Sequence, residues 1–462
     1  MQVVPSTLLA LLLVIALFVK GPYSGLGVFL ATMPFGVAAA FNLPAAGGAS
    51  IMVMDLATVA MLGALLLERD AVPRLLGSMR PGLPGFVLLL LTLFCILAAV
   101  LLPRIFAGMT DVFGLARSNN QVGIISITLH PTTGNLTQLF RILLDALVFF
   151  VLATVLRDRP VAETVLVAVS VATGVHVVLG WLDVLTGATG LTILMEPIRT
   201  ANYAILSEGA MAGLRRMIGG FSEASSFGYF TLGLFGFWLK YWIVAGPSRR
   251  TNWALAMTTI VLLRSTSSSA YVGMIGVLIS LALLSVGGSV GRPVGRRNLS
   301  LFVWSAIGVW FVALVLGGAY AMVQPFTAYI DRALFNKLST ASGIERMNWN
   351  VHAFQNFLDT GFMGAGLGSM RASNWLLACL GSIGVIGTAL FLGFLAKVAQ
   401  LPLPPDGDAR KPVIEGLKAG CLAMFISAML TAPTPDLGLF FFALAAMAAG
   451  LSRGAALESQ LA

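Results

Sequence analysis

Charged residues are scarce in this 462-residue chain. Asp, Glu, Lys and Arg together make up 10% of it, hydrophobic residues make up 58%, and the mean hydropathy is +0.92. Soluble globular proteins carry roughly 25% charged residues, so this composition excludes a soluble globule. The longest apolar runs exceed the length of barrel strands, and helices satisfy their own backbone polar groups within lipid. We therefore expect an all-α polytopic integral membrane protein, with residues 1–462 forming a single transmembrane domain.

Cysteine and histidine are also rare, with three of each. The cysteines lie inside apolar segments and are expected to be small core residues: Cys95, Cys379 and Cys421. The histidines lie far apart in the sequence: His130, His176 and His352. Because no paired-carboxylate motif stands on a predicted outer loop either, we expect neither a metal site nor a cofactor.

Motifs for nucleotide binding are absent: the chain has no Walker or dinucleotide-binding pattern. The GAGLGSMR run at 364–371 lacks a preceding strand, so we expect a flexible or anion-cradling turn there. The net charge of +9 is spread over short loops, which is typical of membrane topology and not of a nucleic-acid surface.

Hydrophobic runs predict about 12 to 13 transmembrane helices. The first run, Thr7 to Val19, has no Lys or Arg before it and no small-residue cleavage pattern after it, so it is expected to be a retained span. The runs lie at about 5–19, 26–41, 51–67, 84–102, 139–156, 161–185, 227–245, 252–263, 270–286, 300–323, 374–396, 413–432 and 437–451.

Positive charges predict the orientation. Arginine and lysine gather in short alternate loops, such as those near 69–80 and 292–297, which should therefore be cytoplasmic. The remaining loops should be extracytoplasmic, and they include the three longest: 103–138, 186–226 and 324–373. The amino terminus is then expected outside and the carboxyl terminus inside.

The loop at 324–373 contains the chain's longest polar stretch. Ser342 and Glu345 form a capping box, apolar residues recur at helical spacing, and Gly361 follows as a stop. The apolar stripe is Met347, Val351, Phe354 and Leu358. An amphipathic helix of this kind is typical of a membrane surface, with its polar flanks open to water or to a site.

Arginines on the outer loops are candidates for binding phosphate, because the guanidinium fork grips phosphate bidentately. The set is Arg199, Arg215, Arg216, Arg346 and Arg371. Each one alone has an ordinary alternative, which is contact with lipid headgroups or with a neighbouring carboxylate. Because five arginines lie on two loops, and two of the five are adjacent, we favour an anionic ligand.

His352 and Glu223 are the candidate proton acceptors. His352 shares a flank of the expected helix with Asp359 and Glu345, although a lone histidine on a surface helix is usually just solvated. Glu223 stands at the start of a span, where its charge can equally serve the helix dipole. Asp55, Asp145 and Asp183 lie within predicted spans, and a pairing of Asp145 with Arg141 is expected.

Three segments together resemble the bacterial O-antigen ligase and Wzy-like polysaccharide polymerase superfamily. They are RRMIGGFSEASSFGYF at 215–230, RSTSSSAYVG at 264–273, and ERMNWNVHAFQNFLDTGFMGAGLGSMRASNWLLACLGSIGVIG at 345–387. The layout is similar too, with about a dozen spans and a large outer loop late in the chain, so the resemblance covers most of the sequence.

The resemblance implies a GT-C-like glycosyltransferase of the bacterial inner membrane. Such an enzyme takes a glycan from undecaprenyl diphosphate on the periplasmic face, without a metal and with inversion at the anomeric carbon. Arg216 and Arg346 would hold the diphosphate. The family often has His-Asn just before the span after the loop, and here Ser373 and Asn374 stand there. His352 or Glu223 would then replace the missing histidine as the base.

The most favoured function is a polymerase that joins repeat units of a surface polysaccharide or exopolysaccharide, with a partner that sets chain length. An O-antigen ligase shares the scaffold and differs in its acceptor glycan, and the missing histidine weighs slightly against it. A transporter or lipid-linked glycan flippase would place polar groups at mid-membrane and usually has two similar halves. The chain shows no such repeat, and a purely structural membrane protein would not need loops this polar.

Overall fold

The computed structural model is mainly helical. It describes residues 1–462 except 45–47, 119–120, 204, 207–208, 212–213, 288–313, 315–316, 319, 334–340 and 462. Within that part, seven helices are long and apolar enough to cross a membrane. They are α1 (Ser6–Ser24), α5 (Pro84–Val100) continued by α6 (Leu102–Ile105), α7 (Thr133–Asp158), α8 (Ala162–Thr189), α15 (Trp375–Ala399), α16 (Arg410–Thr431) and α17 (Gly438–Leu461). The expected polytopic, mainly helical membrane protein is thus confirmed.

Seven further helices belong to the described part of the chain, and four of them match remaining predicted runs. They are α3 (Val53–Leu66), α4 (Ala71–Gly77), α9 (Ala224–Ala245), α10 (Arg249–Arg264), α11 (Ser268–Gly287), α13 (Gln324–Ala333) and α14 (Ala341–Asp359). Thus α3, α9, α10 and α11 coincide with the runs at 51–67, 227–245, 252–263 and 270–286. The run at 300–323 falls largely outside the described residues.

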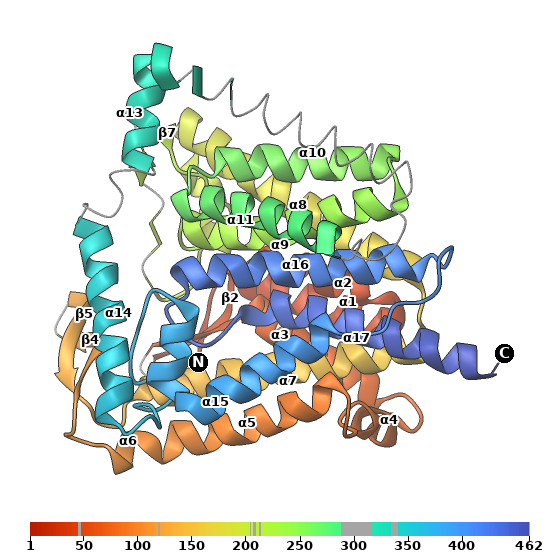
Figure 1. Ribbon diagram of the computed structural model, residues 1–462, viewed down its shortest axis with the longest axis horizontal. Helices are drawn as coiled ribbons and strands as arrows, with labels where there is room; N and C mark the ends of the chain where they lie inside the picture. The colour runs from red at the N-terminus through yellow and green to blue at the C-terminus, as the bar shows by residue number, and fades with distance from the viewer. Residues whose placement is uncertain are drawn as a thin grey trace.

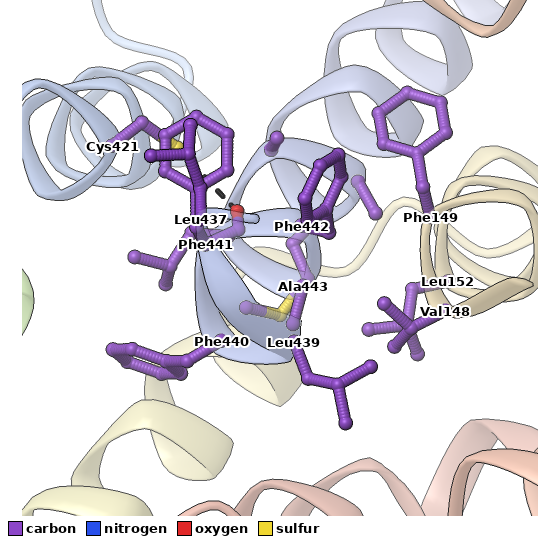
Figure 2. Close-up of a cluster of buried hydrophobic side chains, with 14 of the residues drawn as sticks. Val148, Phe149, Leu152, Cys421, Leu437, Leu439, Phe440, Phe441, Phe442 and Ala443 are labelled. Atoms are coloured by element: carbon purple, nitrogen blue, oxygen red, sulfur yellow. Dashed lines mark hydrogen bonds between the residues drawn. The ribbon is translucent and has the colours of Figure 1, made fainter. Parts of the chain in front are cut away.

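Helix α17 forms the centre of the bundle. Every residue from 439 to 449 is buried, so the helix is enclosed on all sides. It packs against α7 and α16: Figure 2 shows Phe442 on the side that faces Phe149 of α7, and Phe441 on the other side, next to Cys421 of α16. The three cysteines are free and buried, as expected of core residues.

The run at 26–41 was expected to be one helical span, and that expectation is wrong. Only α2 (Leu26–Thr32) is helical; the chain then becomes extended and enters β2 (Ala39–Leu43). Pro34 explains the break, because proline lacks an N–H donor and disfavours helix at the residue before it. The loop at 186–226 satisfies the extended backbone: Val37 N donates to Gly220 O (2.9 Å), and Val37 O accepts from Ala201 N (3.0 Å).

The three long loops gather at one end of the bundle. Figure 1 shows α13, α14, β4, β5 and β7 at that end, and α4 with the C-terminus at the other. The loop at 103–138 contains a hairpin that the sequence analysis missed, with β4 (Asp111–Ser118) antiparallel to β5 (Gln121–Thr128). Smaller antiparallel pairs join β1 (Gln2–Val3), β2 and β3 (Ala49–Met52), and β6 (Ala210–Met211) and β7 (Leu214–Arg215).

Helix α14 confirms the expected amphipathic helix. It lies across that end of the bundle, roughly perpendicular to the long helices (Figure 1). Its predicted apolar stripe points outward, with exposures from 42% at Leu358 to 59% at Val351. The helix ends at the expected stop, Gly361 (φ +58°), whereas Ser342, expected before the first turn, already lies inside the helix.

The glycine-rich turn at 364–371 is tightly packed, so the expectation of a flexible or anion-cradling turn is wrong. Several of its backbone N–H groups are already used: Ala365 donates to Gly381 O (2.7 Å) and Gly366 to Ser382 O (3.0 Å). Asn135 holds the turn from α7 through Leu367 O (2.7 Å) and Ser369 Oγ (2.8 Å). The glycines allow the turn to pack closely against neighbouring backbone: at Gly368 (φ +81°) a Cβ would lie 2.4 Å from Gly134 O.

Candidate functional site: an arginine cluster at the loop end

Asp183, near the end of α8, anchors the second loop. Its side chain is fully buried and accepts four hydrogen bonds. Oδ1 binds Arg199 (2.6 Å) and Arg215 (3.4 Å), and Oδ2 accepts from the backbone N–H groups of Ile218 (2.8 Å) and Gly219 (3.1 Å). Two guanidinium groups on one carboxylate leave a formal charge of +1. Asp183 therefore shapes the loop and leaves it positive.

Arg215 and Arg216 lie on the short β6–β7 hairpin and point in different directions. The Arg215 guanidinium fills the space above Gly187, where an added Cβ would lie 1.8 Å from Nη1. The Arg216 side chain instead lies near Gly209, on the other side of the hairpin strand. Arg264, at the end of α10, adds a further cation by donating to Arg215 O (2.9 Å).

Arg371 lies within electrostatic range of Glu223 but forms no ion pair with it. The guanidinium is partly buried, and its Nε is enclosed without a hydrogen-bond partner among the described residues. Burial lowers the pKa of Arg371, and the negative charge of Glu223 raises it in part. Glu223 itself precedes the first turn of α9 and accepts a hydrogen bond from the Ser225 hydroxyl.

The segment after Arg371 is rigidly placed. Ser373 N donates to Asn350 Oδ1 of α14 (2.7 Å), Ala372 N donates to Pro433 O (3.1 Å), and Trp375 Nε1 donates to Pro435 O (2.9 Å). The α14 helix and the α16–α17 loop therefore hold Arg371 from both sides.

Arg346 and His352 lie on different faces of α14. Arg346 is one turn before Asn350, so it shares the face that touches Ser373. His352 is nearly half a turn away and packs its ring edge-on against Phe113 of β4, with 4.7 Å between centroids. The structure thus brings Arg346, but not His352, to the side of α14 that contacts the Arg371 segment.

Asp359 does not orient His352. One carboxylate oxygen accepts from Thr110 Oγ1 (2.7 Å) and the other from Gln355 Nε2 (2.7 Å). Asp359 and His352 do share a flank of α14, as the sequence indicated. However, Thr110, next to β4, supplies a hydroxyl that binds Asp359, and sequence spacing could not show this contact.

A second buried group lies in the outer part of α3 and α7. Arg141 was expected to pair with Asp145, and this is wrong: Arg141 Nη1 bonds Asp55 Oδ1 (2.6 Å) from α3 instead. Asp145 is 2% exposed, and its Oδ2 has no hydrogen-bond partner among the described residues. Arg141 and Asp145 are one helical turn apart, and this spacing suggested the local pair. Sequence spacing cannot show that α3 brings the carboxylate of Asp55 close to Arg141.

Five arginines of this end were predicted from the sequence, whereas Arg264 and the structural role of Asp183 were not. The available signals were a charged residue inside an apolar run for Asp183 and the polar break after α10 for Arg264. Among the described residues, no group of three or more His, Cys, Asp or Glu side chains is arranged to hold a metal ion. No protein-family model matches the chain, and no curated protein matches it significantly.

Proposed function

We propose that this protein is a membrane glycosyltransferase that moves a glycan from undecaprenyl diphosphate to an acceptor sugar. The resemblance of segments 215–230, 264–273 and 345–387 to the O-antigen ligase and Wzy-like superfamily motivates the reaction. The gathering of Arg199, Arg215 and Arg264 near Asp183 is independent support, because a lipid diphosphate carries concentrated negative charge.

Arg371 is the observation that carries the proposal. Its enclosed Nε lacks an acceptor among the described residues, as do the Nε atoms of Arg199 and Arg215, and such a group loses its hydration without compensation. A phosphate oxygen would supply the acceptor and also neutralise the charge. The segment that bears Arg371 is fixed by α14 and the α16–α17 loop, so the donor site would be formed in advance.

The proposed division of labour among the arginines follows from their partners. Arg199 and Arg215 bind Asp183, so they shape the loop and contribute positive potential. Arg216 and Arg346, which the resemblance assigns to the diphosphate, would grip it directly together with Arg371. Charge neutralisation by these groups stabilises the departing diphosphate without any need for a metal.

Glu223 is the proposed proton acceptor. An acceptor hydroxyl attacks the anomeric carbon, the bond to the diphosphate oxygen breaks, and the hydroxyl proton moves to the Glu223 carboxylate. Single in-line displacement inverts the anomeric configuration. Glu223 is favoured over His352 because its charge acts on Arg371, whereas His352 packs against Phe113.

The finer architecture is part of this proposal. The loops at 103–138, 186–226 and 324–373 would face the periplasm, with the last two forming the active site of a GT-C-like fold of 12 to 13 spans in the bacterial inner membrane. Within this scheme the partners are the lipid-linked oligosaccharide donor, a glycan acceptor, membrane lipids and a chain-length regulator. Repeat-unit polymerisation for a surface polysaccharide or exopolysaccharide is the favoured outcome, and O-antigen ligation is the alternative.

A transporter or flippase of lipid-linked glycans is the competing function from another class. It would use the same affinity for a lipid diphosphate but form no glycosidic bond. The buried Asp55–Arg141 pair and Asp145 are the kind of intramembrane polar group that transporters use. Product formation by the purified protein separates the two functions.

The test is transfer by purified protein in liposomes with an undecaprenyl-diphosphate-linked repeat unit. We expect longer lipid-linked glycans, release of undecaprenyl diphosphate, and an inverted linkage. Arg371→Ala should lose transfer by at least about tenfold, consistent with loss of a charged hydrogen bond. Arg250→Ala, in an exposed pair with Glu163, is the matched control and should retain activity.

Absence of any new glycosidic bond with the wild-type protein, under conditions where the donor binds, would refute the transferase. In the native organism, loss of the gene should leave single repeat units if the protein is a polymerase. Full-length polymer stranded on the lipid carrier would instead identify a ligase. Donor crossing the bilayer without growth would favour the flippase.

A further inference from the structure

A groove lies at the opposite end of the bundle from the arginine cluster, between α1, α2 and the start of α8. Its volume is about 600 Å³, within the range of roughly 300 to 1,000 Å³ that is usual for small-molecule sites. The apolar walls come from Leu13, Gly27, Val28, Ala31, Val167 and Val171.

Helix α2 forms one wall of the groove. It has only seven residues, where a full span was expected. Gly27 faces open space: a Cβ built there would meet no atom within 4 Å. The helices beside it present apolar side chains outward, including Ile15 (59% exposed) and Val167 (43% exposed). The groove therefore opens toward the lipid phase of a membrane-spanning protein.

Polar groups line one end of the groove. Lys20, Ser24, Glu163 and Thr164 belong to its lining. Glu163 is engaged with Arg250 (2.7 Å), whereas Lys20 is exposed on α1. A lysine at the end of an apolar channel suits a lipid whose phosphate lies at the membrane surface and whose chain runs inward.

We propose that this groove is a binding site for one phospholipid of the adjacent leaflet, with an acyl chain along α2 and α8 and the headgroup phosphate at Lys20. The positive-charge pattern predicts this leaflet to be cytoplasmic. The groove shares no residue with the arginine cluster, so the proposal does not depend on the proposed transferase. A hydrocarbon chain is the occupant that fits, because water gains no hydrogen-bond partners from the apolar walls.

The experiment counts phospholipids that remain bound by native mass spectrometry, after purification in mild detergent and titration with phosphatidylglycerol. Gly27→Trp fills the groove and should remove one tightly bound lipid per protein. Gly174→Trp is the matched control, because Gly174 on α8 also faces open space and does not line the groove. Lys20→Glu should keep the groove open and weaken phosphatidylglycerol binding by roughly fivefold or more.

Several outcomes would overturn the proposal. Equal lipid counts for the wild type and Gly27→Trp, with both proteins monodisperse, would exclude the groove as the site. Loss of lipid from Gly174→Trp as well would show a non-specific effect of added tryptophan. Unchanged affinity of Lys20→Glu would refute the phosphate contact, and a polyprenyl lipid in place of a phospholipid would refute the assigned occupant.

Discussion

At the scale of single residues, Asp183 decides how the second loop folds. Asp183→Ala would leave Arg199, 9% exposed, without its carboxylate and would orphan the N–H groups of Ile218 and Gly219. Removing one partner of a buried ion pair costs about 3–5 kcal/mol. We expect a marked fall in the melting temperature of the purified protein. Glu163→Gln removes an exposed pair, should cost about 1 kcal/mol or less, and serves as the control. Equal melting temperatures for the two variants would contradict the assigned role.

Gly187 allows a sharper test of Arg215. In Gly187→Ala, the new Cβ would lie 1.8 Å from Arg215 Nη1, so the flexible side chain must move away while its charge remains. Because Arg199 still holds Asp183 at 2.6 Å, the stability loss should be about 1 kcal/mol or less. Transfer should largely persist if Arg371 grips the diphosphate. A loss as large as that of Arg371→Ala would move Arg215 into direct contact with the donor.

At the scale of elements, the glycine-rich turn is a joint between α5, α7 and α15. Gly368→Ala would bring Cβ to 2.4 Å from Gly134 O and also force an alanine to φ +81°. We expect the free energy of unfolding to fall by more than the roughly 1–3 kcal/mol that a strained backbone alone costs. Gly361 has the same left-handed backbone conformation, but a Cβ there would meet no atom within 4 Å. Gly361→Ala therefore measures the cost of the strained backbone without a steric clash. Thermal unfolding of both variants measures the difference, and equal losses would show that packing is unimportant.

The elements also show how far sequence reasoning reaches. Long apolar runs and the amphipathic period of α14 were predictable because burial of a helical face depends on nearby residues. The break after Thr32 was not, because the backbone of Val37 is satisfied by the distant Gly220 and Ala201. The partners of Arg141 and Asp359 were missed for the same reason. The arginines near the site could be predicted from their positions in the loops. Only the fold shows that Arg199 and Arg215 bind Asp183.

At the scale of the whole molecule, the arrangement predicts which segments share a side of the membrane. Helix α14 and the β4–β5 hairpin lie at one end, and α4 lies at the other (Figure 1). Charge asymmetry predicts that the α4 end is cytoplasmic. Exposed positions suit single-cysteine reporters on these elements: Ile125 and Met347 at the first end, Leu76 and Leu403 at the second.

Replacing the three buried native cysteines by alanine gives a background for these reporters. A membrane-impermeant maleimide applied to cells with a permeable outer membrane should label Ile125→Cys and Met347→Cys. Leu76→Cys and Leu403→Cys should react only after lysis, which also serves as the control that each thiol is accessible. Because one miscounted span reverses only the segments before it, reversal of Ile125→Cys with Met347→Cys unchanged would place an error between them. Reversal of all four would put the arginine cluster in the cytoplasm, where a transferase acting on periplasmic lipid-linked glycans could not work.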